Sequence, residues 1–318
     1  MLYDRKYLLE FGRVYTPSNP EYDINVAEGH TAVFLDQHQI KFKVMRSSST
    51  SLNITEITVY NTSPEVLHYL TIYSDQEILV KLQGGYGDNL TVLTMGTITS
   101  LTDSFEGETR ETVFTVSDGG SHVKTAVLGQ DWFAGTPWEY IMDELIDATF
   151  MPRGVVIPPE GQVLYPYYAD GSAYSSLKDL ATELEYTLNI QNMAINFYPT
   201  GTDKLVNVQI IDESSGLIGS PAVVGDTAGN LLGDGKVKSK GVKFKTLLNG
   251  TLYPDTIIEL RSKEFNGQYQ IQTTKHSGNF RGDDWFTECE CTEFNTIKPL
   301  TTVGRLPDGT AVTVEGEL

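Results

Sequence analysis

The chain has 318 residues, with 42 acidic and 23 basic side chains and a formal net charge of −19. Such a charge excludes long-range attraction to nucleic acid or to anionic lipid. No run of about 18 apolar residues is present and the charged N-terminus lacks the apolar stretch of a signal peptide, so we expect no membrane insertion and synthesis in a reducing cytoplasm.

The first part of the chain, from about residue 30 to residue 127, is predicted to be a series of short strands, because apolar and polar residues alternate between glycine-containing turns. A short helix interrupts them, with Ser63 as its N-cap and Pro64 in its first position. Glu106–Gly107 predicts a hairpin turn, and Pro17 and Pro20 predict an irregular arm before the first strand. The expected strands lie in TAVFLD, QIKFKVMR, SLNITEITVYN, QEILVKLQGGYG, LTVLTMGTITSLT and SFEGETRETVFTVSDGG.

Residues 130 to 200 have a different pattern, typical of a small α/β unit. TPWEYIMDELIDATF predicts a helix that Thr136 caps, with Glu139 completing a capping box. SSLKDLATELEY predicts a second helix, in which Ser176 and Asp179 have the same two roles, and TLNIQNMAINFYP predicts a hairpin. The expected apolar stripes are Trp138, Ile141, Met142, Leu145 and Ile146 on the first helix, and Leu177, Leu180, Ala181 and Leu184 on the second.

Strands are predicted again from residue 205, in LVNVQIIDE, GVKFKTLLNG and DWFTECECTEF. The polar, glycine-containing segment 212–236 is expected to be a long loop. Asn266–Gly267 predicts the type I′ turn of a hairpin, and residues 276–284 are expected to form the loop before the last of these strands. The tail, TTVGRLPDGTAVTVEGEL, is expected either to pair as a weak hairpin or to stay loose.

A row of glutamines follows the Asn266–Gly267 turn. Because side chains alternate along a strand, Tyr269, Ile271 and Thr273 are expected to face the core. The opposite, wet face carries Gln268, Gln270 and Gln272.

No catalytic, cofactor or metal constellation is recognisable in the sequence. The histidines lack partners at the short spacings of a metal site, and no nucleotide-binding or serine-nucleophile motif is present. We therefore predict no catalytic residue, no cofactor and no metal ligand. Cys289 and Cys291 share one face of a strand, where a buried apolar role is favoured; the alternative is a cysteine hydrolase that uses either thiol with His276.

Two further groups of residues have a structural and a functional interpretation. Asp283 and Asp284 are adjacent, so they are expected to cap a turn rather than to face each other across a cleft as glycosidase carboxylates do. The tyrosine-rich segment YPYYAD, residues 165–170, is expected in an interface or the core. A patch that stacks on carbohydrate is the alternative.

Segments in three parts of the chain, spread over about residues 50 to 295, follow one another in a specific order. They are ITEITVYNTSPEVLHYL with EILVKLQGGYGDNLTVLTMGTITSL, then YYADGSAYSSLKDLATELEYTLNIQNMAINFY, then GVKFKTLLNGTLYPDTIIELRS with NGQYQIQTTKHSGNFRGDDWFTE. In this order they resemble the tail hub proteins of bacteriophage baseplates, which are related in fold to the hub part of type VI secretion spikes. The sequence departs from that family at Gly250 and Asp255, where proline and glycine are expected; both are loop positions, so the expected fold is unchanged.

The resemblance implies a mainly β fold with an α/β insert and two tube-forming β-barrel-like domains per chain. The expected domains are a first barrel at 1–128, the insert at 129–202, a second barrel at 203–300 and a tail at 301–318. The resemblance further implies a homotrimer that joins a six-fold tail tube above to a three-fold spike or tail-tip protein below and forms part of a DNA-conducting channel. Other baseplate proteins would surround the insert, and the protein would be part of the virion, made in the cytoplasm of a bacterial host.

A channel for DNA benefits from a lining that does not bind phosphate. We therefore predict that aspartate and glutamate side chains line the lumen, and that Gln268, Gln270 and Gln272 face either the lumen or a seam between subunits. DNA would pass without specific binding, and the protein would be structural rather than enzymatic. The alternatives are a tail-tip adhesin that binds host glycan through residues 165–170, and a cell-wall hydrolase.

Overall fold

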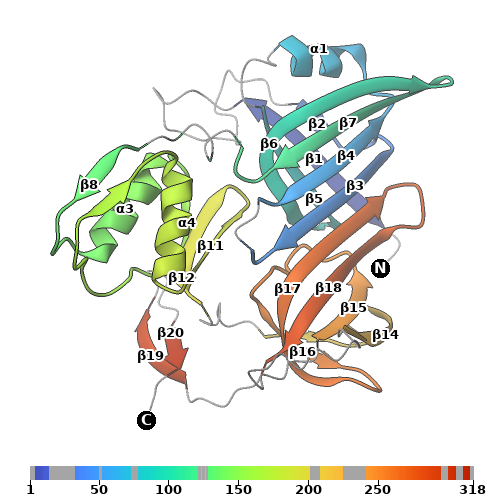
Figure 1. Cartoon of the computed structure of the whole chain (residues 1–318). Coiled ribbons are helices and arrows are strands. Elements are labelled where there is room, and N and C mark those ends of the chain that lie inside the picture. Colours follow the sequence, from blue (N-terminus) through green and yellow to red (C-terminus); the bar gives the residue numbers. More distant parts are fainter. Residues whose placement is uncertain are drawn as a thin grey trace. The chain divides into compact units, whose positions relative to one another are not determined.

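The computed structural model describes residues 4–13, 33–49, 52–72, 78–120, 123, 126, 128–200, 208–224, 241–294, 300–305 and 311–315. The chain divides into two compact units that are built mainly from antiparallel strands (Figure 1). Unit 1 consists of Met1–Met45, Ser49–Thr200 and Ser277–Asp284, and unit 2 of Arg46–Ser48, Gly201–His276 and Trp285–Leu318. The mainly β fold class is confirmed, with an α/β part inside unit 1.

The main sheet of unit 1 has the strand order β3-β4-β7-β6-β5-β1-β2, with antiparallel neighbours throughout. Alternation determines which side chains enter the core: Ile40, Phe42 and Val44 of β3 are buried, whereas Lys41 and Lys43 are exposed. The strands are β1 (Arg5–Arg13), β2 (Val33–Leu35), β3 (Ile40–Ser47), β4 (Ile54–Tyr60), β5 (Ile78–Tyr86), β6 (Asn89–Glu106) and β7 (Thr109–Ser117).

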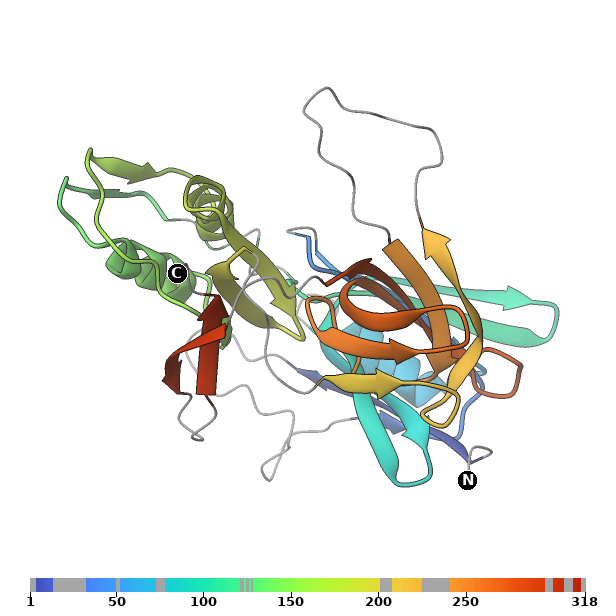
Figure 2. The same ribbon diagram turned by 90° about the horizontal axis from the view of Figure 1, so that it is seen from below.

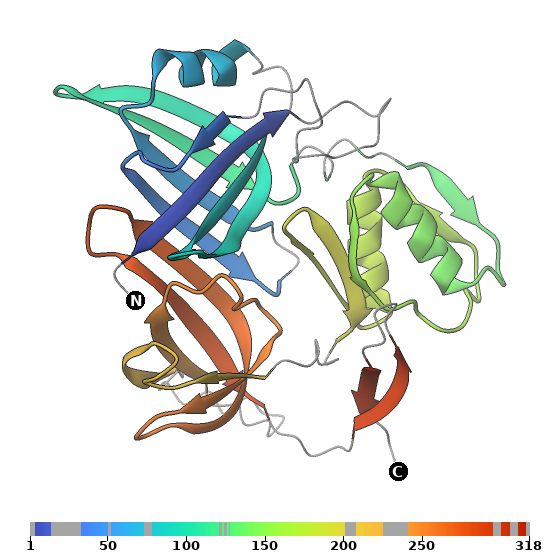
Figure 3. The same ribbon diagram turned by 180° about the vertical axis from the view of Figure 1, so that it is seen from behind.

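This sheet is strongly curled (Figure 3). Phe11 lies in β1 and Phe114 in β7, with β5 and β6 between the two strands. In a flat sheet this separation is about 14 Å, because neighbouring strands are about 4.8 Å apart. The two ring centroids are only 5.4 Å apart. The curl therefore closes the sheet around a shared core, as in a barrel.

Strand β1 corrects the expected irregular arm. Arg5–Arg13 pairs with β5 along its whole length and lies between β5 and β2 in the sheet. Tyr7, Leu9 and Phe11 are buried in alternation. The apolar Leu8, between Tyr7 and Leu9, interrupts this period in the sequence. Pro17 and Pro20 lie outside the described residues.

The turns and the helix of the first sheet agree with the sequence. Helix α1 is Pro64–Ile72, and the backbone nitrogen of Val66 donates to Ser63 Oγ at 3.3 Å, as expected of an N-cap. Gly107 has a φ of 61° in the turn between β6 and β7. Of the helices in the described part of the chain, none has the length and apolar character needed to cross a membrane.

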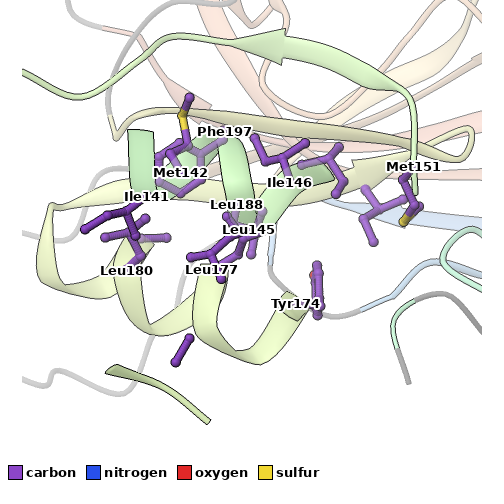
Figure 4. Packing of buried hydrophobic residues seen from close by; sticks show 14 of the residues in the cluster. Ile141, Met142, Leu145, Ile146, Met151, Tyr174, Leu177, Leu180, Leu188 and Phe197 are labelled. Carbon is purple, nitrogen blue, oxygen red and sulfur yellow. The ribbon is translucent and has the colours of Figure 1, made fainter. Parts of the chain in front are cut away.

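The α/β part of unit 1 packs two helices against a three-stranded sheet, β11-β12-β9 (Figure 4). The predicted apolar stripes are confirmed: Ile141, Leu145, Leu177 and Leu180 are completely buried, together with Phe197 of the sheet. The elements are β8 (Gln130–Trp132), α3 (Trp138–Ala148), β9 (Arg153–Val156), β10 (Tyr167–Ala169), α4 (Ala173–Glu183), β11 (Tyr186–Gln191) and β12 (Ala194–Pro199).

Both predicted N-caps of these helices are wrong. Helix α3 starts after Pro137 without a side-chain cap, and Thr136 Oγ1 instead donates to the Phe133 carbonyl at 2.8 Å. Helix α4 starts earlier than expected: Ser172 accepts from the backbone nitrogen of Ser175 at 3.0 Å, and Ser176 is buried inside the helix. At α4, Ser172, Ser175 and Ser176 are close together, so the sequence pattern is ambiguous there.

A buried group of polar side chains joins the α/β part to the first sheet. Asp118 Oδ2 accepts from Asn53 Nδ2 at 3.0 Å and from the backbone nitrogen of Asn192 at 3.1 Å. Asn53 Nδ2 also lies 2.9 Å from the carbonyl oxygen of Ile190 and 3.1 Å from Gln191 Oε1. The β11–β12 turn, in which Asn192 has a φ of 51°, is thereby fixed to the end of β7. No sequence pattern predicted this junction.

Unit 2 contains a second curled sheet with the order β14-β15-β18-β17-β16-β13 (Figure 2). Its core joins Ile211 of β13 to Val242 and Phe244 of β15 in one apolar cluster, although these strands are well separated in the sheet. The strands are β13 (Gln209–Ile211), β14 (Leu217–Val224), β15 (Gly241–Leu247), β16 (Ile257–Arg261), β17 (Asn266–Asn279) and β18 (Trp285–Glu293).

The two sheets repeat one topology. In sheet order, the strands β3-β4-β7-β6-β5-β1 of unit 1 correspond to β14-β15-β18-β17-β16-β13 of unit 2. In both sheets the next three strands after β4 or β15 follow one another as antiparallel neighbours. The last of the three, β7 or β18, pairs with β4 or β15. The units differ in that β1 is antiparallel to β5, whereas β13 is parallel to β16. This equivalence is not visible in the amino-acid letters.

The hairpin β16–β17 turns at a different place from the one predicted. Arg261 pairs with Asn266, so residues 262–265 form the turn, and Asn266–Gly267 begins β17. Ser262 closes this turn because its hydroxyl donates to the Phe265 carbonyl at 2.8 Å and accepts from the Phe265 nitrogen at 2.9 Å. The serine thus replaces the positive-φ residues of a two-residue turn.

Other predictions in unit 2 need smaller corrections. Leu217–Val224 is a strand inside the segment expected to be a loop, and residues 225–240 lie outside the described residues. Strand β17 continues to Asn279, so His276 is in the strand and not in the following loop. The predicted terminal hairpin is confirmed by the pairing of β19 (Leu300–Arg305) with β20 (Ala311–Glu315). The four domain limits proposed from the sequence stay predictions.

Candidate functional site

The stretch with the most reactive side chains, residues 269–291, lies in β17 and β18 of unit 2. Cys289 and Cys291 are buried in the apolar cluster of unit 2, and Glu288 and Glu290 alternate with them on the other face. His276 is also completely buried, and its Nδ1 lies 2.9 Å from Thr287 Oγ1. The shared face of the cysteines, predicted from the period of two, is confirmed.

Burial makes these groups poor catalysts. Burial raises the pKa of the Cys289 thiol, with smaller contributions from Cys291 and Glu288, and burial followed by Glu290 raises the pKa of Cys291. Burial and then the charge of Arg46 lower the pKa of His276 to about 3. Because a catalytic cysteine acts as a thiolate, usually next to a histidine cation, this environment argues against the cysteine-hydrolase alternative.

The two thiols are expected to resist a water-soluble disulfide reagent at mildly alkaline pH in the folded protein and to react completely after denaturation. The reason is that neither solvent nor reagent reaches Cys289 or Cys291 without opening of the sheet. Absorbance of the released thiolate measures this. Glu290→Cys places a thiol on the open face of the same strand and is the control; it should react at once. Rapid reaction of both native thiols would contradict their placement in the core.

The predicted glutamine row lies on the outer face of the unit 2 sheet. Gln268 is exposed and Gln270 and Gln272 are half-buried. Gln272 Nε2 donates to Thr292 Oγ1 at 3.1 Å and lies 3.4 Å from Gln270 Oε1. Thr273 does not face the core as expected, because the burial pattern shifts by one residue after Ile271 and resumes at Thr274.

Ion pairs occupy the rest of this outer face. Lys243 Nζ is 3.2 Å from Glu290 Oε1, and Lys275 Nζ is 3.1 Å from Glu288 Oε2. Lys245 Nζ lies 3.3 Å from the centre of the Phe286 ring. The outer face is therefore polar, with charges of both signs rather than an excess of acids; whether it is wet in an assembly stays a prediction.

Replacing Gln268, Gln270 and Gln272 together by valine is expected to promote aggregation while the fold is kept. The row is solvated and its substitution creates an exposed apolar strand face. Light scattering measures aggregation, and circular dichroism of the soluble fraction measures folding. Ile271→Gln, on the buried face of the same strand, is the matched control and should instead lower stability. Loss of fold in the triple variant would show that the row is not on an open face.

The two adjacent aspartates lie in the turn between β17 and β18. Asp283 and Asp284 are both exposed there. The backbone nitrogen of Asn279 donates to the Asp284 carbonyl at 2.6 Å, and Arg5 Nη1 donates to the Gly282 carbonyl at 2.5 Å. These bonds involve backbone oxygens rather than the carboxylates, so the expected capping role of the two aspartates stays a prediction.

No group of three histidine, cysteine, aspartate or glutamate side chains within the described ranges is arranged to hold a metal ion. His30 and His122 lie outside those ranges.

The tyrosine-rich segment lies in a long antiparallel ribbon of unit 1. Tyr167 pairs with Trp132, and Tyr168 pairs with Asp131. Tyr167 lies on the inner side, with its ring centroid 5.9 Å from that of Trp132 and 5.6 Å from that of Trp138. Tyr165 and Tyr168 are exposed. The segment is thus divided between core and surface, whereas the sequence analysis predicted a single environment for all of its residues.

Two solved tail proteins share the fold of this chain. The 43 kDa tail protein of prophage MuSo2 from Shewanella oneidensis has a TM-score of 0.58 and 9% sequence identity, over 91% of this chain and 98% of that one. The tail protein from Neisseria meningitidis MC58 has a TM-score of 0.59 and 8% identity, over 90% of this chain and 96% of that one.

A secretion-system protein has the same architecture. The E. coli c3393 protein, a component of the type VI secretion system, has a TM-score of 0.55 and 9% identity, over 83% of this chain and 78% of that one. No protein-family model matches the sequence, and no curated protein is similar to it in sequence. The predicted resemblance to tail proteins and secretion-spike proteins is therefore confirmed in the fold.

Proposed function

We propose that this chain is a structural protein of a phage tail, the hub of the baseplate, which acts as a homotrimer. The repeated strand order of units 1 and 2 is the observation that carries this proposal. Three copies of a chain with two equivalent sheets present six equivalent sheets. Such a ring matches a six-fold tail tube on one side while its true symmetry matches a three-fold spike or tail tip on the other.

The fold shared with two tail proteins and a type VI secretion component supports this role. In it the tail tube protein binds above the trimer, the spike or tail-tip protein binds below, and other baseplate proteins surround the α/β part. The protein resides in the virion and contributes to the channel through which DNA passes without specific binding. The buried thiols favour a non-enzymatic role over a hydrolase.

The lining of this channel is proposed to be acidic or neutral, so that it does not bind phosphate. The outer face of the unit 2 sheet carries the glutamine row and balanced Lys–Glu pairs, so an acidic lining requires other strands. An electrostatic map of the assembled ring tests the idea. A lumen lined mostly by lysine and arginine would overturn it.

Two measurements test the hub. Native mass spectrometry of the purified chain, alone and mixed with its tail tube protein, should give a species of three times the chain mass of 35.2 kDa. Negative-stain images of antibody-labelled particles should show the label at the distal end of the tube, on its axis. A label on peripheral fibres, or a chain that stays monomeric with its tube protein, would contradict the proposal.

A second candidate is a tail-tip adhesin, which the exposed Tyr165 and Tyr168 favour because sugars stack on aromatic rings. Binding of the purified chain to a glycan array, lost on Tyr165→Ser with Tyr168→Ser, would support it over the hub.

A further inference from the structure

The ribbon in the α/β part of unit 1 keeps one register beyond the paired strands β8 and β10. The two segments of the ribbon are also hydrogen-bonded outside these strands. The nitrogen of Leu128 donates to the Gly171 carbonyl at 3.0 Å, and the nitrogen of Gly135 donates to the Val163 carbonyl at 2.8 Å. A further bridge pairs Pro137 with Gln162. Residues 128–138 and 161–171 therefore form an antiparallel ribbon, which is interrupted by a turn where the Thr136 nitrogen donates to the Phe133 carbonyl at 3.1 Å.

The inner face of this ribbon is rigidly packed. The ring of Tyr167 contacts the rings of Trp132 and Trp138, and Trp132 Nε1 donates to Glu144 Oε2 of α3 at 2.6 Å. Tyr140 Oη donates to the other oxygen of that carboxylate at 2.6 Å. Because these contacts fix the backbone, the Cα positions of the outer face are held in place before any partner binds.

The outer face is apolar and open. Along a ribbon, Asp131 and Phe133 share the side opposite to Trp132, and Tyr168 faces Asp131 across the pair. The residues of this outer patch have large exposed fractions: Phe133 82%, Leu164 78% and Tyr168 67%. Exposed aromatic residues grouped in this way are typical of a protein interface.

The surroundings of the patch are strongly acidic. Between residues 129 and 200 the chain has ten acidic residues and only two basic ones, Arg153 and Lys178. Arg153 is already paired with Asp143 and Asp147. The ribbon itself has Asp131 and Asp170 but no lysine or arginine. Any partner that covers the patch therefore meets a negative potential.

We propose that the outer patch of this ribbon docks a basic, arginine-bearing surface of another tail protein. Guanidinium planes stack on the rings of Tyr168 and Phe133, and Asp131 accepts their hydrogen bonds. Aliphatic side chains of the partner cover Leu164. Phe133 and Leu164 offer no hydrogen-bonding group to a sugar, which favours a protein as the occupant over a glycan. This assignment rests on the proposed role in a tail and names the chemistry of one partner.

Binding of fluorescent peptides to the full-length chain tests the proposal by anisotropy, at low and at moderate ionic strength. Three peptides of equal length alternate leucine with arginine, glutamate or serine. The arginine peptide is expected to bind about tenfold more tightly than the serine peptide, and more weakly as salt is raised. The double variant Phe133→Ser with Tyr168→Ser should lose about tenfold in affinity although its net charge is unchanged.

Matched variants separate the patch from the general acidity of the chain. Phe105→Ser removes an equally exposed ring from the β6–β7 hairpin, and Glu108→Gln removes a charge from the same turn; neither should alter binding, whereas Asp131→Asn should weaken it. An unchanged affinity in the Phe133–Tyr168 variant would overturn the proposal, and so would glycan-array binding that this variant abolishes. The hub role fails separately, if particle labels lie off the tail axis.

Discussion

Replacing Asp118 with alanine is expected to lower the free energy of unfolding of unit 1 by about 2–4 kcal/mol. Asp118 is almost completely buried, and one of its oxygens accepts from Asn53 and from the backbone of Asn192. Alanine leaves the half-buried backbone nitrogen of Asn192 without this acceptor and removes one of three acceptors near Asn53 Nδ2. Loss of a buried acceptor costs about 1–3 kcal/mol, and more when that acceptor is charged. Urea denaturation measures the total loss.

The loss should be local in its first effect. The backbone of Asn192 belongs to the β11–β12 turn, and Asn53 also contacts the Ile190 carbonyl in the preceding strand. Hydrogen exchange detected by mass spectrometry should therefore increase in residues 186–199 at lower denaturant concentrations than in β4 to β7.

Asp118→Asn keeps the shape and one acceptor oxygen and should recover part of the loss. Asp179→Ala, on the exposed face of α4, is the control and should change stability by less than about 0.5 kcal/mol. Equal effects of the two alanine variants would show that the buried junction is not stabilising.

The type of each element was readable where one period covered many residues. Ile141 and Leu145 on α3, and Leu177 and Leu180 on α4, recur at helical spacing and are all buried. In the same way, alternation alone placed Cys289 and Cys291 on the inner face of their strand. These are local patterns, and each is repeated often enough to outweigh exceptions.

The starts and turns of the elements were harder to predict because a few hydrogen bonds decide them. Ser262 closes the β16–β17 turn with its own hydroxyl, although Asn266–Gly267 is the stronger turn signal in the sequence. Ser172, not Ser176, caps α4. Each of these outcomes depends on whether one particular hydroxyl group reaches a backbone partner, and sequence spacing does not reveal that.

The polar groups that link distant segments could not be predicted at all. Asn53 meets Asp118 and Ile190, which are 65 and 137 residues further along the chain. The outer patch of the ribbon was only half recognised, since the tyrosines were noted in the sequence whereas Phe133 and Leu164 were not. The signal that was available is the excess of acidic residues in 129–200, ten against two basic ones, which predicts a negatively charged surface for this part.

His276 should make the stability of unit 2 depend on pH. Its Nδ1 is bonded to Thr287 Oγ1, and this hydroxyl lies between the nitrogen and the carbonyl oxygen of Asn249, at 3.0 Å and 3.4 Å. Donation from Nδ1 to Oγ1 fits this arrangement, which leaves Nε2 unprotonated. Among the described residues Nε2 has no hydrogen-bonding partner, so a proton there would be buried without an acceptor. Burial and then Arg46 accordingly lower the pKa of His276 to about 3 from 6.5.

The sign of the effect follows from this lowered pKa. Above pH 6.5 the histidine is neutral in both the folded and the unfolded chain, so it adds no pH dependence. Between pH 6.5 and about 3 the unfolded chain takes up a proton that the folded chain excludes. In that window the free energy of unfolding is expected to fall by about 1.4 kcal/mol for each unit of decreasing pH. Below about pH 3 both states are protonated and this contribution becomes constant.

Comparison of variants isolates this slope from the titration of the carboxylates. Hydrogen exchange of β17 and β18, corrected for the intrinsic rate at each pH, gives the opening free energy of unit 2 between mildly alkaline and mildly acidic pH. His276→Asn retains a donor toward Thr287 but does not titrate, so it should be less stable at every pH and show a smaller slope than the wild type. His68→Asn, at an exposed position of α1, should leave the slope unchanged. If His276→Asn has the same slope as the wild type, the folded protein takes up the proton on His276 in the same pH range as the unfolded chain. That result would contradict the placement of His276 in the core without an acceptor for Nε2.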